Sequence, residues 1–141
     1  MNFYRQDIRA IGNYYESAYE YAFVTDGTIE GERREEEVII VRKIWLAGGC
    51  FWGVEAYFRQ LRGVIDTQVG YGQGMTDEPT YRDVCSGETG HTEICEVSYD
   101  ENVLPLRKIL EHYFRIIDPT TLNRQGPDRG TQYRTVIYYA E

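Results

Sequence analysis

Apolar and polar residues follow two different spacings along the chain, and the change falls near residue 38. In residues 8–22, apolar side chains recur at helical spacing, and many of them are tyrosines. Residues 25–37 are polar and end in a run of charged side chains. We therefore expect an amphipathic helix followed by a solvated linker. Residues 1–37 would then be an appendage to a domain over residues 38–141.

Strand-like and helical segments alternate from residue 38 onward. Two helices are predicted by apolar residues at i, i+3, i+4 and i+7, over residues 53–62 and 106–117. Strands are predicted from buried or alternating apolar runs at residues 38–46, 65–71, 94–99 and 135–139. The order strand, helix, strand, strand, helix, strand is typical of split βαβ folds. The predicted fold class is therefore α/β (α+β), a ferredoxin-like two-layer sandwich with a βαββαβ core and an N-terminal helical extension.

Two long connections interrupt this pattern. Residues 72–90 contain glycine and proline, and residues 118–133 have no apolar period. A loop as long as the second is usually functional or disordered in a compact domain, and its specific turn formers argue against disorder. We expect it to hold Asp128 and Tyr133 in fixed positions. The glycine-rich stretch 70–74 is interpreted as an open loop between strands, because no helix follows it as a nucleotide-binding turn would require.

Composition and charge narrow the function classes. The 141 residues, with 15 Lys+Arg against 23 Asp+Glu and a formal net charge of -8, suit one ordinary domain. This acidic balance argues against nucleic acid or an anionic membrane surface as partner, because both reward clustered Lys and Arg. The longest uncharged, mainly apolar run, residues 44–54, is too short to span a bilayer. Residues 1–17 lack an apolar h-region, and the three cysteines show no CxxC spacing. We therefore expect a cytoplasmic protein with free thiols.

Cys50 lies where the first predicted strand turns into the first predicted helix. Gly48 and Gly49 precede it, and Phe51 and Trp52 follow it. Unpaired N–H groups and the positive end of the helix dipole at such a junction stabilise a thiolate. The carboxyl end of a strand is also where α/β folds bind ligands. Two interpretations stay open: a reactive nucleophile, or an ordinary core cysteine among apolar residues.

Glu93 and His91 lie at the start of the third predicted strand. A desolvated Glu93 would hold a proton at neutral pH and act as a general acid, although a solvated carboxylate is the commoner outcome. His91 would form a thiolate and imidazole pair with Cys50 in a cysteine hydrolase. As a second alternative, His91 would bind zinc together with Cys85 and Cys95, but the spacing of these residues is not one that zinc sites use. We predict no metal site.

Several short segments stand in a fixed order between residues 43 and 139. They are Gly49-Cys50-Phe51-Trp52-Gly53-Val54-Glu55, Gly70-Tyr71-Gly72, Pro79-Thr80-Tyr81, Val84-Cys85-Ser86-Gly87, Thr89-Gly90-His91-Thr92-Glu93, Asp118-Pro119-Thr120 and residues 124–134. Together these segments resemble the peptide methionine sulfoxide reductase A family. Several motifs in the family's order are far more specific than any one of them alone.

The resemblance implies thiol-dependent reduction of methionine S-sulfoxide, free or in oxidised proteins, as part of oxidative damage repair. It implies that Cys50 is the nucleophile and becomes a sulfenic acid, a reversible state of cysteine. It also implies that Glu93, Tyr81 and Tyr133 bind and protonate the sulfoxide oxygen. No cofactor would be bound, and thioredoxin, glutaredoxin with glutathione or another thiol would serve as the external reductant.

The substrate pocket is likewise inferred from the resemblance. Phe51 and Trp52 match the aromatic pocket for the substrate's S-methyl group, and Asp128 matches an acidic residue that lines the site. An apolar aromatic pair both contacts a methyl group and excludes water, which raises the pKa of a neighbouring carboxyl such as Glu93.

The chain departs from the family pattern at both ends. Family members usually continue past the last matched strand and often carry recycling cysteines there, so residues 38–141 resemble a catalytic domain without that C-terminal region. Either Cys85 or Cys95 would then be the resolving thiol, or an external thiol would reduce Cys50 directly, or the chain would be a fragment. The alternatives to an active reductase are a truncated, inactive relative that acts as a binding module, and a hydrolase that uses Cys50 and His91.

Overall fold

The computed structural model describes residues 2–3, 9–10, 22–23 and 39–139. The helices are α1 (Phe51–Phe58), α2 (Tyr81–Cys85) and α3 (Leu106–Ile116), with a 3-10 turn η1 (Thr131–Tyr133). The strands are β1 (Asn2–Phe3), β2 (Arg9–Ala10), β3 (Ala22–Phe23), β4 (Ile39–Ala47), β5 (Val64–Gly72), β6 (Thr92–Asp100), β7 (Arg124–Gln125), β8 (Asp128–Arg129) and β9 (Val136–Tyr139). The predicted mixed α/β class is confirmed.

One sheet runs through the domain in the strand order β1-β5-β6-β4-β9-β2, and β3 also pairs with β4. Its pairs are antiparallel except for the parallel pair of β1 with β5. The long strands β4, β5 and β6 form the centre of the sheet. A bulge between Val64 and Asp66 interrupts the pairing of β5 with β6 near its start.

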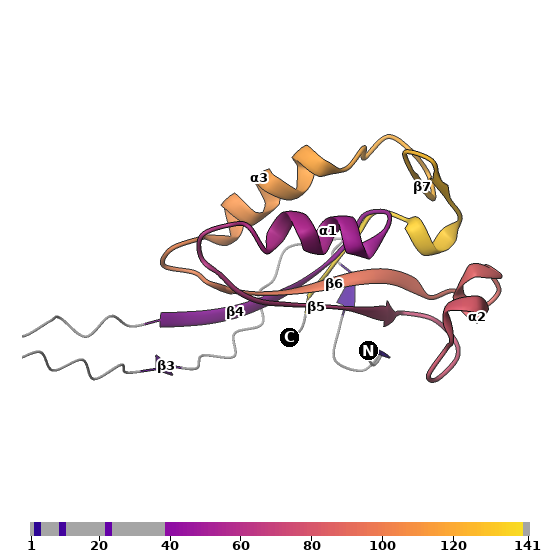
Figure 1. The fold of residues 1–141 in the computed structure, drawn as a ribbon, viewed down its shortest axis with the longest axis horizontal. Coiled ribbons are helices and arrows are strands. Elements are labelled where there is room, and N and C mark those ends of the chain that lie inside the picture. Colours follow the sequence, from indigo (N-terminus) through magenta and orange to yellow (C-terminus); the bar gives the residue numbers. More distant parts are fainter. Residues whose placement is uncertain (1, 4–8, 11–21, 24–38, 140–141) are drawn as a thin grey trace, which may run out of the picture.

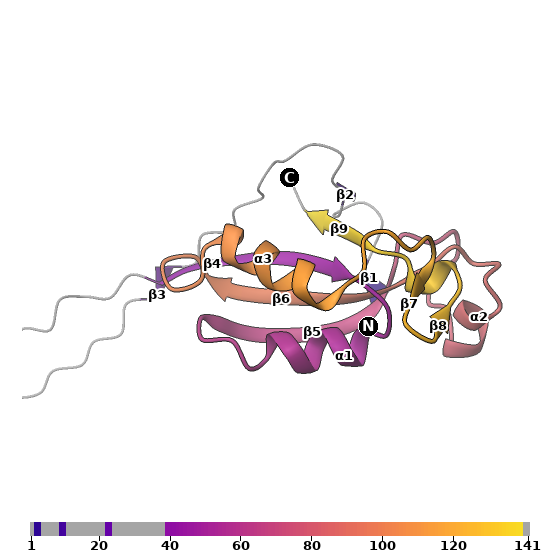
Figure 2. The ribbon, with the colours of Figure 1, turned by 90° about the horizontal axis from the view of Figure 1, so that it is seen from above.

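The helices α1 and α3 pack on the same face of this sheet (Figures 1 and 2). Apolar residues at alternate positions of β4 and β6 point toward them, as a strand requires. The resulting core holds Ile44, Leu46, Val54, Phe58, Cys95, Val97, Tyr99, Leu104, Ile109, Tyr113 and Ile117. Alternate positions on the other face form a smaller buried cluster of Trp45, Ala47, Ile94 and Tyr138. No helix among the described residues has the length and apolarity needed to cross a membrane.

The observed elements differ from the sequence prediction in several places. The helix α1 ends at Phe58 rather than at residue 62, because the N–H groups of Gln60 and Leu61 turn to carbonyls three residues back. The strand β6 begins at Thr92 and therefore includes Glu93, and β5 ends at Gly72, one residue past the predicted strand and within the stretch 70–74 that is predicted to be an open loop.

Two further predictions concern the N-terminus and the first connection. The N-terminal helix expected over residues 8–22 lies largely outside the described residues, and the pairs described there, Arg9–Ala10 and Ala22–Phe23, are short strands. The sequence prediction missed α2 within residues 72–90. The Thr80 hydroxyl accepts a hydrogen bond from the Asp83 N–H, and the Asp83 carboxylate accepts one from the Thr80 N–H. This capping box stabilises a five-residue helix that is too short to show a period.

Candidate active site

The chain turns sharply from β4 into α1 at Cys50. Gly49 has a φ of 83°, a conformation that favours glycine, and a Cβ there would lie 2.8 Å from the Cβ of Gln125. The Cys50 carbonyl accepts hydrogen bonds from the N–H groups of Gly53 and Val54 at 3.1 and 3.4 Å, which begins the helix. The half-buried Cys50 side chain therefore stands at the N-terminus of an eight-residue helix.

Glu93 lies beside this helix start. Its side chain is only 3% exposed, and its Oε2 accepts a hydrogen bond of 3.0 Å from the backbone N–H of Phe51. Burial raises the pKa of Glu93, the charge of Asp128 raises it further, and the bond from Phe51 lowers it in part. The net direction is upward, so this carboxyl group retains its proton to a higher pH than an ordinary glutamate.

Three phenol groups gather around Glu93, from β5, α2 and η1. Burial and the charge of Glu93 raise the pKa of Tyr133 to about 12. The pKa of Tyr81 is raised mainly by a hydrogen bond with Cys85, and the charges of Glu93 and Cys50 contribute, although the ring is 63% exposed. Both tyrosines therefore remain protonated donors at neutral pH.

Tyr71 is a site residue that the sequence interpretation missed. The pairing of β5 with β6 sets it opposite Glu93, and its ring centroid lies 5.4 Å from that of Phe51. Burial and the charge of Glu93 also raise its pKa. Thr67, Val69 and Tyr71 alternate in the predicted strand 65–71 and share the face that bears Glu93, but the chain has no signal for which strand pairs with it.

Phe51 and Trp52 form an aromatic pair immediately after Cys50. Their ring centroids lie 5.2 Å apart in an edge arrangement with an interplanar angle of 72°. Phe51 is buried, whereas Trp52 is 62% exposed. The pair therefore gives the surroundings of Cys50 an apolar wall that is open to solvent on one side.

Asp128 reaches the site on the β7–β8 hairpin, which pairs Gln125 with Asp128. The Gln125 amide nitrogen donates to the Asp118 carbonyl and to the Thr135 hydroxyl, each at 2.8 Å. Its oxygen accepts from the Asp118 N–H, also at 2.8 Å. Gln125 thus fastens the exit of α3 to the entry of β9, and its Cβ supports the backbone at Gly49.

The remaining cysteines occupy opposite environments. Cys85 is exposed at the end of α2, while Cys95 is fully buried in the core under the helices. Burial, with the charges of Glu55 and Glu96, raises the pKa of Cys95 to about 12. Cys50, Cys85 and Cys95 are all free thiols.

His91 does not pair with Cys50. Its Nε2 is 2.7 Å from the carbonyl oxygen of Thr76, so that nitrogen donates to the backbone. The thiolate and imidazole pair of a cysteine hydrolase is therefore not formed. Across the described part of the chain, no group of three or more His, Cys, Asp or Glu side chains is arranged to hold a metal ion.

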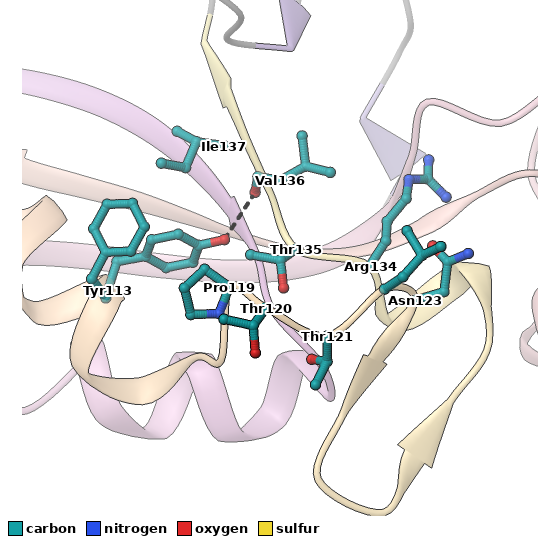
Figure 3. Close-up of a pocket in the computed structure, with 11 residues that line it drawn as sticks. Tyr113, Pro119, Thr120, Thr121, Asn123, Arg134, Thr135, Val136 and Ile137 are labelled. Atoms are coloured by element: carbon teal, nitrogen blue, oxygen red, sulfur yellow. Dashed lines mark hydrogen bonds between the residues drawn. The ribbon is translucent and has the colours of Figure 1, made fainter.

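A cavity of about 620 Å³ lies between the end of α3 and β9, as Figure 3 shows. Neither Cys50 nor Glu93 lines it. Its wall includes Thr121 and Thr135, and the Thr135 hydroxyl also binds Gln125. The cavity is thus separate from the cluster around Cys50, although the two share the support that Gln125 provides.

Comparison with known proteins identifies the relatives of this chain. Residues 42–141 match the family model described as peptide methionine sulfoxide reductase. Proteins named peptide methionine sulfoxide reductase MsrA from Clostridium acetobutylicum and Clostridium tetani are 55% and 56% identical to it over 101 and 102 residues. Each alignment covers 72% of this chain and 62% of the relative. The chain therefore spans less than two thirds of the length of these curated relatives.

Solved structures agree with these matches. The structure of methionine sulfoxide reductase A of Corynebacterium diphtheriae has a TM-score of 0.69 at 44% identity, covering 72% of this chain and 48% of the other. Reduced Mxr1 from Saccharomyces cerevisiae has a TM-score of 0.64 at 45% identity, covering 67% and 57%. On the family model, the sequence identity and the shared fold, the chain belongs to the peptide methionine sulfoxide reductase family.

Proposed function

We propose that this chain reduces methionine S-sulfoxide, free or peptide-bound, to methionine in a thiol-dependent repair of oxidative damage. One observation carries the proposal: a buried carboxyl group of raised pKa, Glu93, is hydrogen-bonded to the residue that follows Cys50. A nucleophilic sulfur and a proton donor at neutral pH are the groups that this reduction requires. The family matches support the same activity.

In the proposed reaction, the Cys50 thiolate attacks the sulfoxide sulfur while Glu93 gives its proton to the sulfoxide oxygen. Tyr81 and Tyr133 donate hydrogen bonds to the same oxygen, which leaves only when it is protonated. The net step moves one oxygen atom. Methionine sulfoxide is reduced by two electrons to methionine, and Cys50 is oxidised by two electrons to a sulfenic acid.

The substrate's S-methyl group would rest against Phe51 and Trp52. Phe51 is buried and Trp52 is exposed, so the pair supplies an apolar surface beside Cys50 that a side chain reaches from solvent. Asp128 would line the site and, through its charge, help to keep the proton on Glu93.

Regeneration would use thiols and no bound cofactor. Two thiol equivalents reduce the sulfenic acid to the Cys50 thiol, and they become a disulfide with release of water. We propose thioredoxin, glutaredoxin with glutathione, or another small thiol as the source. Between the two candidate resolving cysteines, the exposure of Cys85 and the burial of Cys95 favour Cys85.

The finer description of the fold is also part of this proposal. The order β5-β6-β4-β9, with α1 and α3 on one face, supports a ferredoxin-like two-layer sandwich over residues 38–141. Residues 1–37 would be an appendage to this catalytic domain. We further propose a cytoplasmic location, because the reducing cytoplasm keeps the free thiols in the state that the reaction needs.

A single-turnover measurement tests the function. The reduced chain is mixed with one equivalent of methionine S-sulfoxide and dimedone, without added reductant, and analysed by intact-protein mass spectrometry. We expect methionine together with a dimedone adduct on Cys50, and neither product in a folded Cys50→Ser variant. Loss of two thiols with no adduct would identify an internal resolving cysteine. If no methionine forms and every thiol survives, the proposed function is wrong for this chain.

A further inference from the structure

The imidazole of His91 is buried just before β6, with only 6% of the residue exposed. Its Nε2 lies 2.7 Å from the carbonyl oxygen of Thr76. A carbonyl oxygen only accepts hydrogen bonds, so Nε2 carries the proton and donates it. The Nδ1 atom is buried and has no hydrogen-bond partner within the described part of the chain. The Thr76 hydroxyl also lies 3.2 Å from Nε2, so Thr76 supplies the directional contacts that fix the ring, and the carbonyl bond is the shorter of the two.

The same ring packs directly against Gly74. A side chain at Gly74 would overlap the imidazole, so the absence of a Cβ is what allows the backbone to come so close. Beside it, the Met75 N–H donates to the Thr89 carbonyl at 2.8 Å. Three contacts thus hold residues 74–76 against the segment before β6. The imidazole ring packs on Gly74, its Nε2 binds Thr76, and the Met75 N–H binds the Thr89 carbonyl.

These contacts restrain a connection that carries a site residue. Residues 73–91 join β5 to β6 and contain α2, on which Tyr81 lies. The hydrogen bonds of α2 are local, since the capping box joins Thr80 to Asp83. Its buried Val84 anchors the helix from one side, and the contacts at residues 74–76 restrain the approach to it from the other. The position of Tyr81 therefore depends on how firmly this connection is held.

We propose that His91 is a positioning residue for sulfoxide reduction. Its imidazole holds residues 74–76 against the start of β6 and so keeps Tyr81 beside Glu93. His91 acts through Tyr81 and does not touch the substrate. This role rests on the proposed function, because it assumes that Tyr81 donates a hydrogen bond to the sulfoxide oxygen. It accounts for a buried histidine that neither the nucleophile nor a metal uses.

Substitutions at position 91 separate the hydrogen bond from the bulk of the side chain. In His91→Gln the amide nitrogen occupies about the place of Nε2 and still donates to the Thr76 carbonyl. The amide of His91→Asn is too short to reach it, so this variant is the matched control. We expect the single-turnover rate constant to fall roughly five- to tenfold in His91→Asn and His91→Ala, because a residue that acts only through Tyr81 costs no more than the loss of the Tyr81 hydroxyl. The Gln variant should stay within about threefold of wild type, since the bond remains.

A double-mutant cycle tests whether His91 acts through Tyr81. If it does, His91→Ala should slow a Tyr81→Phe enzyme by less than about twofold, because the group being positioned is already gone. In a Tyr133→Phe background, the full effect of His91→Ala should persist. Equal effects in all three backgrounds would show a general structural role and overturn the proposal.

Hydrogen exchange measures the restraint without any reaction. The Met75 amide and the amides of residues 76–78, 80 and 81 should exchange faster in His91→Asn than in wild type, and His91→Gln should match wild type. If His91→Ala fails to fold, Gly74→Ala disturbs the same contact from the other side and should give the same pattern. Unchanged exchange in these variants would overturn the proposal. A wild-type chain that forms no methionine would instead overturn the proposed function, and the role of His91 in it.

Discussion

The two connections that bring phenol groups to Glu93 are held in place by different means. Residues 118–135 carry Tyr133, and the Gln125 amide joins both ends of this segment through several hydrogen bonds. Residues 73–91 carry Tyr81 on a short helix whose own bonds are local. One segment is braced at many points, and the other depends on a few contacts.

Arg134 links the two connections directly. Its guanidinium donates to the Thr131 carbonyl within the braced segment and to the Gly90 carbonyl at the end of the other, at 2.9 and 3.0 Å. Both views show α2 and the β7–β8 hairpin at the same end of the sheet (Figures 1 and 2). Through Arg134, residues 118–135 can therefore support residues 73–91, and substitutions in the two segments should differ in their consequences.

The largest effect on the rate should come from Glu93, because both connections bring a phenol group to it. Glu93→Gln removes the proton donor, so we expect the single-turnover rate constant to fall about 10²- to 10⁴-fold. In the wild type, the rate should decline as the pH rises through the raised pKa of Glu93, and the variant should lose that decline. Stopped-flow measurement of methionine formation across pH checks both. The exposed Glu88→Gln is the matched control and should behave like wild type.

Glu93→Gln should slow the reaction but raise the free energy of unfolding near neutral pH. Because folding raises the pKa of Glu93 above its ordinary value of 4.5, wild-type stability is lost as the pH rises from that value through the folded pKa. Glu93→Gln escapes this loss. Urea unfolding should find it more stable than wild type near neutral pH, with the difference vanishing in acid. A variant less stable at every pH would contradict the buried, protonated carboxyl.

The next largest effects on the rate should come from removing the phenol hydroxyls of Tyr133 and Tyr81. We expect Tyr133→Phe to slow the reaction by about 10² and Tyr81→Phe by about 10, because a desolvated donor bonds more strongly than one that competes with water. Tyr133 is half-buried with a pKa raised to about 12, whereas Tyr81 is mostly exposed. Single-turnover rates at one pH decide the order. The reverse order would mean that the α2 side makes the stronger contact with substrate.

Substitutions of Gln125 test how much its hydrogen bonds to the two ends of residues 118–135 stabilise the fold. Gln125→Glu keeps the volume against Gly49 but cannot donate to Asp118 or Thr135, so about 2 kcal/mol of unfolding free energy should be lost at roughly 0.5–1.5 kcal/mol per hydrogen bond. Urea denaturation measures this loss. Activity should fall by less than in Tyr133→Phe, since the hairpin pairing remains. Gln125→Met, which keeps the bulk without any charge, is the control for the added carboxylate.

The smallest effect concerns the short helix. Thr80→Ala removes the hydroxyl of the capping box, and we expect the rate constant to fall roughly two- to fivefold. Thr80→Ser keeps the hydroxyl and should restore the wild-type rate. If Thr80→Ala has no effect even on amide exchange in α2, the helix is held by its tertiary contacts alone.

Periodicity predicted the elements that carry the core, because their apolar residues repeat over many positions. Glu93 shows where such prediction stops. Its environment depends on the N–H of Phe51, far away in sequence, so the pattern of the chain alone favours the commoner solvated carboxylate over the buried one that the fold shows. Tyr71 lies within the predicted strand 65–71, but its place opposite Glu93 depends on the pairing of β5 with β6, which periodicity does not give.

Short elements escape periodicity altogether. The helix α2 has too few residues for an apolar stripe, and only the Thr80 and Asp83 pair marks its start. The supporting role of Gln125 also has no signal in the chain, since an amide bonds with any nearby backbone group. The roles assigned to Cys50, Glu93 and the tyrosines remain predictions that the experiments above address.

The bulge between Val64 and Asp66 has a consequence for how the length of this chain can vary. Beyond it, every residue of β5 has a set partner on β6, and Tyr71 faces Glu93. One residue inserted between Asp66 and Tyr71 would turn Tyr71 to the opposite face while most of the sheet still formed. The exposed Ile65 at the bulge is where an added residue does least harm. Successful insertions and deletions in this strand should therefore cluster on the bulge side, away from the phenol.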